Sequence, residues 1–319
     1  MNMTPVHKPS SWHLGITVIA ITALIAAVTL FGGGYFIYLL NLVGIFSLVA
    51  IGLNILTGTS GQISLGHAGF FAIGAYAAAL LSSKVGMPFW IAIPIASIFT
   101  TLIGALVALP ALRLKNLYLA IATLGFGIVA QKMIFEWRDI TGGGGGMEVP
   151  IPYFFGVSLA DGGRMTWVIA LVLALGTLAA HRIVSGRTGR AFTMLNENEL
   201  AAGCLGIQVS RYKVIAFAIS AFYTAVAGGL YANLVRYINP ESFNVNMSIM
   251  FLAMIVIGGM GSVRGSLLGA AFYVLMPEAV RGFKDAPGLI FGLSLMLVVI
   301  LLPGGLTSMF KPRPKKVGP

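Results

Sequence analysis

The sequence predicts an all-α polytopic membrane protein, with one transmembrane domain over residues 1–319. Charged residues make up 9% of its 319 positions, hydrophobic residues make up 58%, and the mean hydropathy is +0.94. A soluble domain carries about 25% charged residues, so this chain lacks the polar surface that water requires. Apolar runs of helical span length recur while strand-length alternation is absent, which favours helices over a membrane barrel.

The apolar runs set the expected number of crossings. They lie at 14–31, 35–57, 68–82, 89–110, 117–135, 166–183, 213–235, 247–260, 266–281 and 288–303. Because a helical span needs about 20 residues, the runs at 68–82, 247–260 and 266–281 are short. The first run lacks a clear small-residue cleavage site, so we expect a retained helix and not a signal peptide. The pattern predicts about ten transmembrane helices, some of them short or broken and rich in glycine.

The basic residues predict the orientation. They lie at the ends of apolar runs, so the positive-inside bias explains the net charge of +11 without nucleic acid as a partner. With about ten crossings, one side holds Lys8, the Arg113/Lys115 turn, a loop at 185–213 and a basic tail at 311–319. We therefore expect both termini in the cytoplasm.

Two glycine-rich polar breaks interrupt the apolar pattern, one in each half of the chain. The first comprises Asn54 and the run TGTSGQISLGHAG at 57–69, and the second is GGMGSVRGSLLG at 258–269. Paired glycine-interrupted segments predict discontinuous helices around a translocation path, because irregular backbone at membrane depth must face protein or a water-filled cavity. Close packing of small residues between helices is the alternative interpretation.

The first break supplies the candidate path residues. All are neutral or small, and they are Asn54, Gly61, Gln62, Ser64, Gly66 and His67. For His67, a hydrogen-bonded structural role is the alternative.

The segment at 185–213 is polar and lies between two strong apolar runs. Residues 191–202 are rich in Ala, Leu, Met and Glu, which favours a helix, and Gly203 and Gly206 are expected to end it. We interpret the segment as a cytoplasmic coupling loop, with a short helix that a soluble partner grips. A solvated loop whose charges only fix the topology is the alternative. Cys204, the single cysteine, is expected to be a small buried residue.

An outward segment at 136–165 contains five consecutive glycines at 142–146. Because glycine loses more conformational entropy on ordering than other residues, a flexible loop is one interpretation. A hinge, or a backbone surface that a partner or substrate approaches closely, is the other.

The titratable residues argue against an enzyme. All nine acids lie in loops or near the ends of apolar runs. A carboxylate at mid-membrane costs at least about 2.5–3.5 kcal/mol and marks proton-coupled carriers, so such a carrier is disfavoured, while sodium held by backbone groups stays open. The four histidines lack metal-ligand spacing and no GxxxxGK[ST] loop occurs. We expect no catalytic residue, metal or cofactor in this chain.

Three passages resemble one family of membrane transporters. They are GQISLGHAGFFAIGAY at 61–76, YLAIATLG at 118–125 and ENELAAGCLGI at 197–207, and the second glycine-rich break also fits. Together they resemble the permease subunits of bacterial ABC importers for branched-chain amino acids, specifically the second of the two paired permease types. The likeness covers roughly residues 35–303.

The resemblance implies a complex in the bacterial inner membrane. Its other members are a second permease subunit, two cytoplasmic ATPase subunits that bind ATP, and a periplasmic substrate-binding protein. The coupling helix of such permeases fits a groove of the ATPase, and the residues that match it or flank it here are Arg187, Arg190, Glu197, Glu199, Ala201, Ala202 and Gly206. Asn196 and Gly203 stand where relatives often carry a charge. Urea, amides and aromatic acids are alternative substrates within the family, and an ion-coupled secondary carrier is the alternative class.

Overall fold

The computed structural model describes residues 33–112, 114, 116–154, 156–160, 162–281, 287–302 and 304–310. The first apolar run, Lys8, the Arg113/Lys115 turn and the basic tail lie outside these residues. Their predicted orientation therefore still rests on the sequence.

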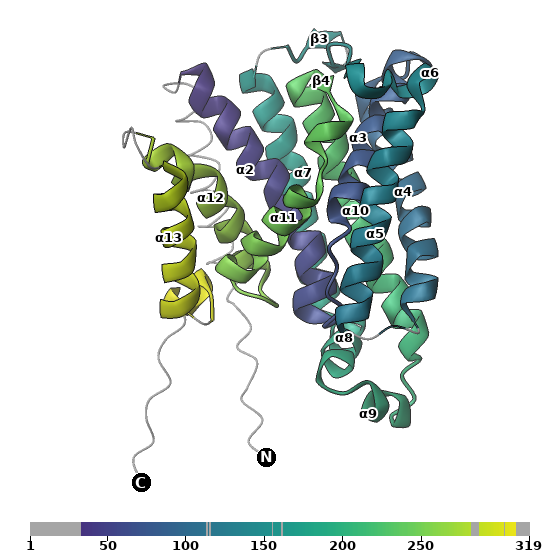
Figure 1. Ribbon diagram of the computed structural model, residues 1–319, viewed down its shortest axis with the longest axis vertical. Coiled ribbons are helices and arrows are strands. Elements are labelled where there is room, and N and C mark those ends of the chain that lie inside the picture. Colours follow the sequence, from purple (N-terminus) through teal and green to yellow (C-terminus); the bar gives the residue numbers. More distant parts are fainter. Residues whose placement is uncertain are drawn as a thin grey trace.

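The described chain is almost entirely helical (Figure 1). Its first half contains α2 (Gly34–Leu53), the π-helix η1 (Asn54–Thr59), α3 (His67–Ser83), α4 (Phe89–Ala111) and α5 (Asn116–Glu136). Short elements follow: α6 (Arg138–Thr141), the 3-10 helix η2 (Gly143–Gly145), β1 (Met147–Glu148), β2 (Tyr153–Phe154) and β3 (Val157–Ser158). The second half contains α7 (Gly162–Ser185), α8 (Arg187–Glu197), α9 (Glu199–Cys204), α10 (Val209–Val235), β4 (Tyr237–Ile238), η3 (Pro240–Ser242), α11 (Val245–Gly258), α12 (Val263–Ala279), α13 (Pro287–Leu301) and η4 (Leu306–Phe310).

The helices follow the predicted apolar runs closely. The three runs predicted to be short correspond to α3, α11 and α12, which have 17, 14 and 17 residues. Within the described residues, 6 helices are long and apolar enough to cross a membrane. The chain is thus a multi-pass helical membrane protein, and the full count of about ten crossings stays a prediction.

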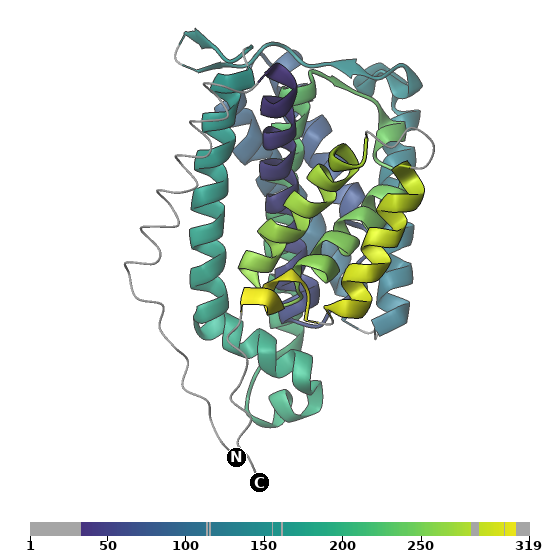
Figure 2. The same ribbon diagram turned by 90° about the vertical axis from the view of Figure 1, so that its left-hand side faces the viewer.

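α10 is the central helix of the bundle. It packs against α2, α3 and α4, and Figure 2 shows purple α2 running along the bundle while the yellow-green helices of the second half cross it obliquely. Glycine permits the closest of these contacts, because a Cβ at Gly74 would lie 2.5 Å from Ala225 Cα and one at Gly228 would overlap Phe71 O. Beside them, the rings of Phe71 and Phe251 pack with centroids 5.5 Å apart.

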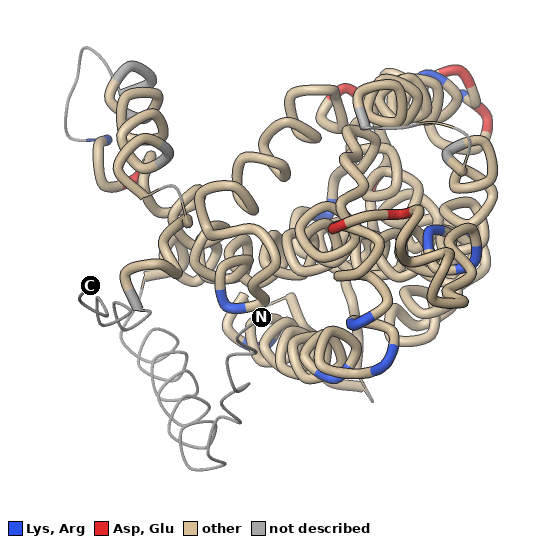
Figure 3. Tube along the Cα trace, turned by 90° about the horizontal axis from the view of Figure 1, so that it is seen from below, with Lys and Arg blue, Asp and Glu red and all other residues tan. Residues whose placement is uncertain are grey.

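The two ends of the bundle carry different structures. β4 and α6 lie at one end, and α8 and α9 lie at the other (Figure 1). Figure 3 views the α8–α9 end and shows short runs of basic and acidic residues along an otherwise uncharged trace. At the opposite end, Lys84 Nζ donates to Asp139 O at 2.9 Å, which joins the α3–α4 turn to the predicted outward segment at 136–165.

The five-glycine segment is folded, contrary to the flexible-loop interpretation. Gly142, Gly143 and Gly146 have positive φ, a conformation that glycine adopts at little cost. β1 and β4 pair antiparallel directly after the segment. Tyr237 Oη donates to Gly145 O at 2.5 Å, and Asn239 Nδ2 donates to Gly144 O at 3.1 Å. The side chains around β4 therefore hold the glycine backbone in one conformation.

The α3–α10 contact gives a stability prediction. Gly228→Ala is expected to lower the free energy of unfolding by about 1–3 kcal/mol, because its methyl group would push against the backbone of α3. Gly125→Ala on α5 is the matched control, since a Cβ there meets nothing within 4 Å, and alanine improves helix propensity by up to about 1 kcal/mol. Thermal unfolding of both variants in detergent tests the contact. Equal melting temperatures would contradict it.

Candidate functional site

The first break begins where α2 widens into a π-helix. Side chains of this turn satisfy the freed backbone groups locally: Ser60 Oγ donates to Leu56 O at 2.7 Å, and Thr57 Oγ1 donates to Gln62 O at 3.1 Å. Gly61, with φ 74°, then reverses the chain. Residues 60–66 carry no regular helix before α3 starts at His67. The predicted discontinuity is therefore present.

The second break separates α11 from α12. Gly259 and Gly261 have φ values of 118° and 77°, and the Ser262 side chain caps α12 by accepting from Gly265 N at 3.2 Å. A Cβ at Gly258 would overlap Gly265 O. The glycines here both break the helices and let them cross closely, which agrees with the alternative interpretation of close packing between small residues. A translocation path at this break stays a prediction.

Asn54 joins the two breaks. Its Nδ2 lies 2.9 Å from Ser262 O, 2.8 Å from Ser266 Oγ and 3.3 Å from Gly259 O, so its two hydrogens are shared among three acceptors. Its Oδ1 accepts from Gly261 N at 2.7 Å. Asn54 is buried, so one carboxamide satisfies a set of polar groups that water does not reach.

His67 ties the start of α3 to its surroundings. Its Nδ1 lies 3.0 Å from Ser64 Oγ and its Nε2 lies 2.6 Å from Ser220 Oγ of α10. The imidazole and both hydroxyls are buried. This geometry fits the hydrogen-bonded structural role weighed for His67.

The remaining candidate path residues lie in the same break. Gln62 is buried, and its Nε2 donates to Ser60 Oγ at 2.9 Å while its Oε1 has no partner among the described residues. Gly66 packs against α5, since a Cβ there would overlap Thr123 O. The predicted path residues thus contact different neighbours: Asn54 meets the second break, Gly66 meets α5 and His67 meets α10. Their side chains face protein in this conformation.

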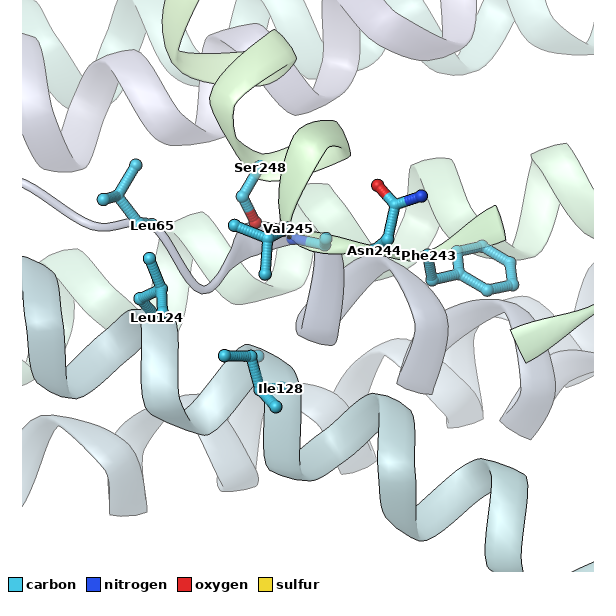
Figure 4. Close-up of a pocket in the computed structure, with 9 residues that line it drawn as sticks. Leu65, Leu124, Ile128, Phe243, Asn244, Val245 and Ser248 are labelled. Carbon is cyan, nitrogen blue, oxygen red and sulfur yellow. Dashed lines mark hydrogen bonds between the residues drawn. The ribbon is translucent and has the colours of Figure 1, made fainter. Parts of the chain in front are cut away.

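A narrow pocket lies beside the first break (Figure 4). Its lining comes from the residues around the start of α3, from α5 and from the start of α11, and the labelled residues are Leu65, Leu124, Ile128, Phe243, Asn244, Val245 and Ser248. The polar atoms have partners within the chain: Ser248 Oγ accepts from Ala68 N at 2.9 Å, and Asn244 Oδ1 accepts from Met247 N at 3.3 Å. The rest of the lining is apolar, and in this conformation the crevice has no room for a water molecule.

The coupling segment forms two helices, so the single helix that we expected is wrong. Asn198 has an extended backbone between α8 and α9, and its Oδ1 accepts from Leu200 N and Ala201 N at 3.0 and 3.1 Å. An asparagine N-cap of this kind starts a new helix. Gly206, with φ 81°, lies just after the end of α9, as predicted for a residue that ends a helix. Gly203, which was also expected to end the helix, lies inside α9.

One face of α8 holds the pair of helices against the bundle. Its buried residues are Gly189, Ala191, Phe192 and Leu195, and the Phe192 ring packs edge-on against Tyr212 of α10 at 6.2 Å. Arg187 and Arg190 lie on the exposed side. The amphipathic pattern therefore fixes α8 along the end of the membrane-spanning helices.

α9 forms an exposed tip with an internal ion pair. Glu199 Oε1 lies 2.6 Å from Lys213 Nζ, and the two side chains are 43% and 6% exposed. Ala202 is buried under the tip, while Glu197 and Ala201 are exposed. Cys204 is also exposed, so its predicted burial is wrong: α9 is short and turns this side chain outward.

The sequence patterns did not predict several hydrogen-bond and ion-pair partners of the site residues. Ser220 and Ser266 lie inside apolar helices, 153 and 212 residues from His67 and Asn54, so no local spacing connects them. Lys213 lies in the helix that follows the one containing Glu199. The sequence analysis also did not predict that Leu200 and Leu205 form an exposed apolar surface, because leucine is usually buried. They are 82% and 67% exposed.

Membrane-spanning helices, two breaks that meet in the interior and an amphipathic helix pair at one end define a membrane permease built on discontinuous helices. Residues 35–302 match the family described as branched-chain amino acid transport system / permease component. The chain belongs to this family.

Individual relatives agree with the family match. The chain is 36% identical to the high-affinity branched-chain amino acid transport system permease protein LivM of Salmonella typhimurium, and equally to that of Escherichia coli, over 295 residues that cover 85% of this chain and 69% of each relative. It is 26% identical to the corresponding LivH protein of Escherichia coli over 301 residues, which cover 85% of this chain and 93% of that protein. The resemblance seen in the sequence motifs is thereby confirmed.

The Glu199–Lys213 pair gives a second prediction. Glu199→Ala is expected to speed amide hydrogen exchange in residues 199–207 about tenfold, because it leaves a buried ammonium without its partner, a loss of roughly 1–2 kcal/mol. Adding Lys213→Met removes that ammonium and should restore most of the protection. Glu197→Ala, at the neighbouring exposed acid, is the control and should change nothing. Equal exchange in Glu199→Ala and Glu197→Ala would show that the ion pair does not hold α9.

Proposed function

We propose that the chain is the transmembrane permease subunit of an ATP-driven ABC importer. It forms part of the path for branched-chain amino acids that a periplasmic binding protein delivers. Its partners are a second permease subunit, two cytoplasmic ATPase subunits and the binding protein. ATP binds to the ATPase partners, and this chain contributes no cofactor site of its own. The family membership and the identity to LivM support this assignment.

The observation that carries the proposal is the exposed apolar tip of α9. Leu200 and Leu205 are 82% and 67% exposed at the end of the bundle. Exposed leucines flanked by charged residues are typical of a protein contact surface. A soluble ATPase with an apolar groove, bordered by polar groups for Arg187, Arg190 and Glu197, fits this surface.

The same surface suggests the orientation. An ATPase partner must lie in the cytoplasm, so α8 and α9 face the cytoplasm and the β1–β4 pair faces the periplasm of a bacterial inner membrane. Both termini are then cytoplasmic under the predicted count of crossings. The folded five-glycine segment presents backbone on the periplasmic side, where a binding protein would dock.

The substrate path uses neutral groups. Asn54, Gln62, Ser64 and His67, with the backbone of Gly61 and Gly66, become accessible when the breaks move. The narrow crevice beside them has a mostly apolar lining and would have to widen to admit a branched hydrocarbon side chain. A neutral path binds a zwitterion weakly and leaves affinity to the binding protein. Urea, amides and aromatic acids are the alternative substrates.

Docking is tested by changing the tip. Leu200→Asp and Leu205→Asp are each expected to weaken copurification of the ATPase at least about thirtyfold, the size of an interface hot spot. ATP-driven uptake of leucine should be lost with it. Gln208→Asp is the control, because it adds the same charge at an exposed position just beyond the tip.

Two outcomes would defeat the proposal. One is an ATPase that stays bound to both tip variants. The other is uphill transport by the isolated chain in sealed vesicles, which would identify a secondary carrier.

A further inference from the structure

Asn196 connects α8 to the first break. It lies in the last turn of α8, and its Nδ2 donates to Gly58 O at 3.4 Å. Its side chain also covers Gly61, where a Cβ would overlap Asn196 Oδ1. The two sides of this contact lie 138 residues apart in the sequence, and Asn196 brings α8 into direct contact with the π-helix.

Gly58 continues the connection to Asn54 and the second break. A Cβ at Gly58 would overlap both Asn54 Oδ1 and Gly261 N. The π-helix backbone, the Asn54 carboxamide and the Gly259–Ser262 turn are therefore in mutual contact. Close-packed protein interiors have low compressibility. A shift of Gly58 is therefore expected to move Asn54 and Gly261 with it.

The C-terminal turn closes the far side of the second break. A Cβ at Gly259 would overlap Thr307 Oγ1, and one at Gly305 would overlap Gly259 N. The second break is thus packed on both faces. A direct contact from this break toward α8 runs through Asn54, Gly58 and Asn196.

We propose that Asn196 and Asn54 are positioning residues that couple movement of the α8–α9 pair to both helix breaks. Asn196 passes the movement to the first break, and Asn54 passes it on to the second, so the two discontinuous helices open and close together. This proposal rests on the proposed function, since it needs an ATPase to move α8. The π-helix fits the role, because π-turns within helices are frequent at functional sites.

The test places one thiol reporter in each break. Cys204, the single cysteine, is replaced by serine, and ATP-driven leucine uptake of this parent is verified first. Ile63→Cys reports on the first break and Met260→Cys on the second, since these residues are 39% and 59% exposed. The rate of N-ethylmaleimide labelling is measured for the assembled complex in liposomes, with and without ATP and Mg²⁺.

The expected pattern separates the two asparagines. In the parent, ATP changes the labelling rate at both reporters. Asn196→Ala should reduce the ATP-dependent change at both, by about fivefold for one lost hydrogen bond. Asn54→Ala should keep the change at Ile63→Cys and lose it at Met260→Cys. Thr193→Ala on the exposed side of α8 is the control, because its hydroxyl bonds only to Gly189 O of its own helix among the residues that the structure describes.

The experiment distinguishes failure of the relay from failure of the proposed function, because the presence of the ATPase and the labelling rates are measured separately. A complex without any ATPase refutes the proposed function, and the inference falls with it. If the ATPase is present, an ATP response at Met260→Cys that survives Asn54→Ala refutes the relay through Asn54. A response that survives Asn196→Ala at both reporters refutes the relay from α8. A parent in which neither reporter responds to ATP also refutes it.

Discussion

The requirement that buried backbone groups find hydrogen-bond partners shapes this protein more than any other constraint. A helix broken inside a membrane exposes N–H and C=O groups that lipid cannot satisfy. Here the second break presents Gly259 O, Gly261 N and Ser262 O, and the side chain of Asn54 bonds to all three. The carboxamide from one half of the chain therefore stabilises the break in the other half.

Glycine makes this arrangement possible by admitting backbone where side chains would collide. Gly58 lies against Asn54 and Gly261, and Gly258 lies against Gly265. At the opposite end of the bundle, glycines at 142–146 supply the positive φ values that let the outer segment fold under Tyr237. Both regions look flexible from their composition, and in each the glycines serve close contact and a fixed backbone conformation.

The sequence predicted the helices, the two breaks and the polar segment, because apolar periodicity and glycine-rich interruption are local signals. It did not predict the pairing of the breaks, since Asn54 and Ser266 lie 212 residues apart. The split of the coupling segment at Asn198 was also missed, because the composition of residues 191–202 favours a continuous helix and the cap depends on one backbone angle. The exposure of Leu200 and Leu205 was not predicted either, because exposure depends on tertiary packing and not on the local sequence.

The central claim is that the two breaks stabilise each other through Asn54. A double-mutant cycle of Asn54→Ala and Ser266→Ala, followed by thermal unfolding of the purified protein in detergent, measures their interaction most directly. Because the two side chains share a buried hydrogen bond of 2.8 Å, we expect the double variant to be less destabilised than the sum of the single variants by about 1 kcal/mol. Strictly additive effects would contradict the claim and would mean that each break is stable independently of the other.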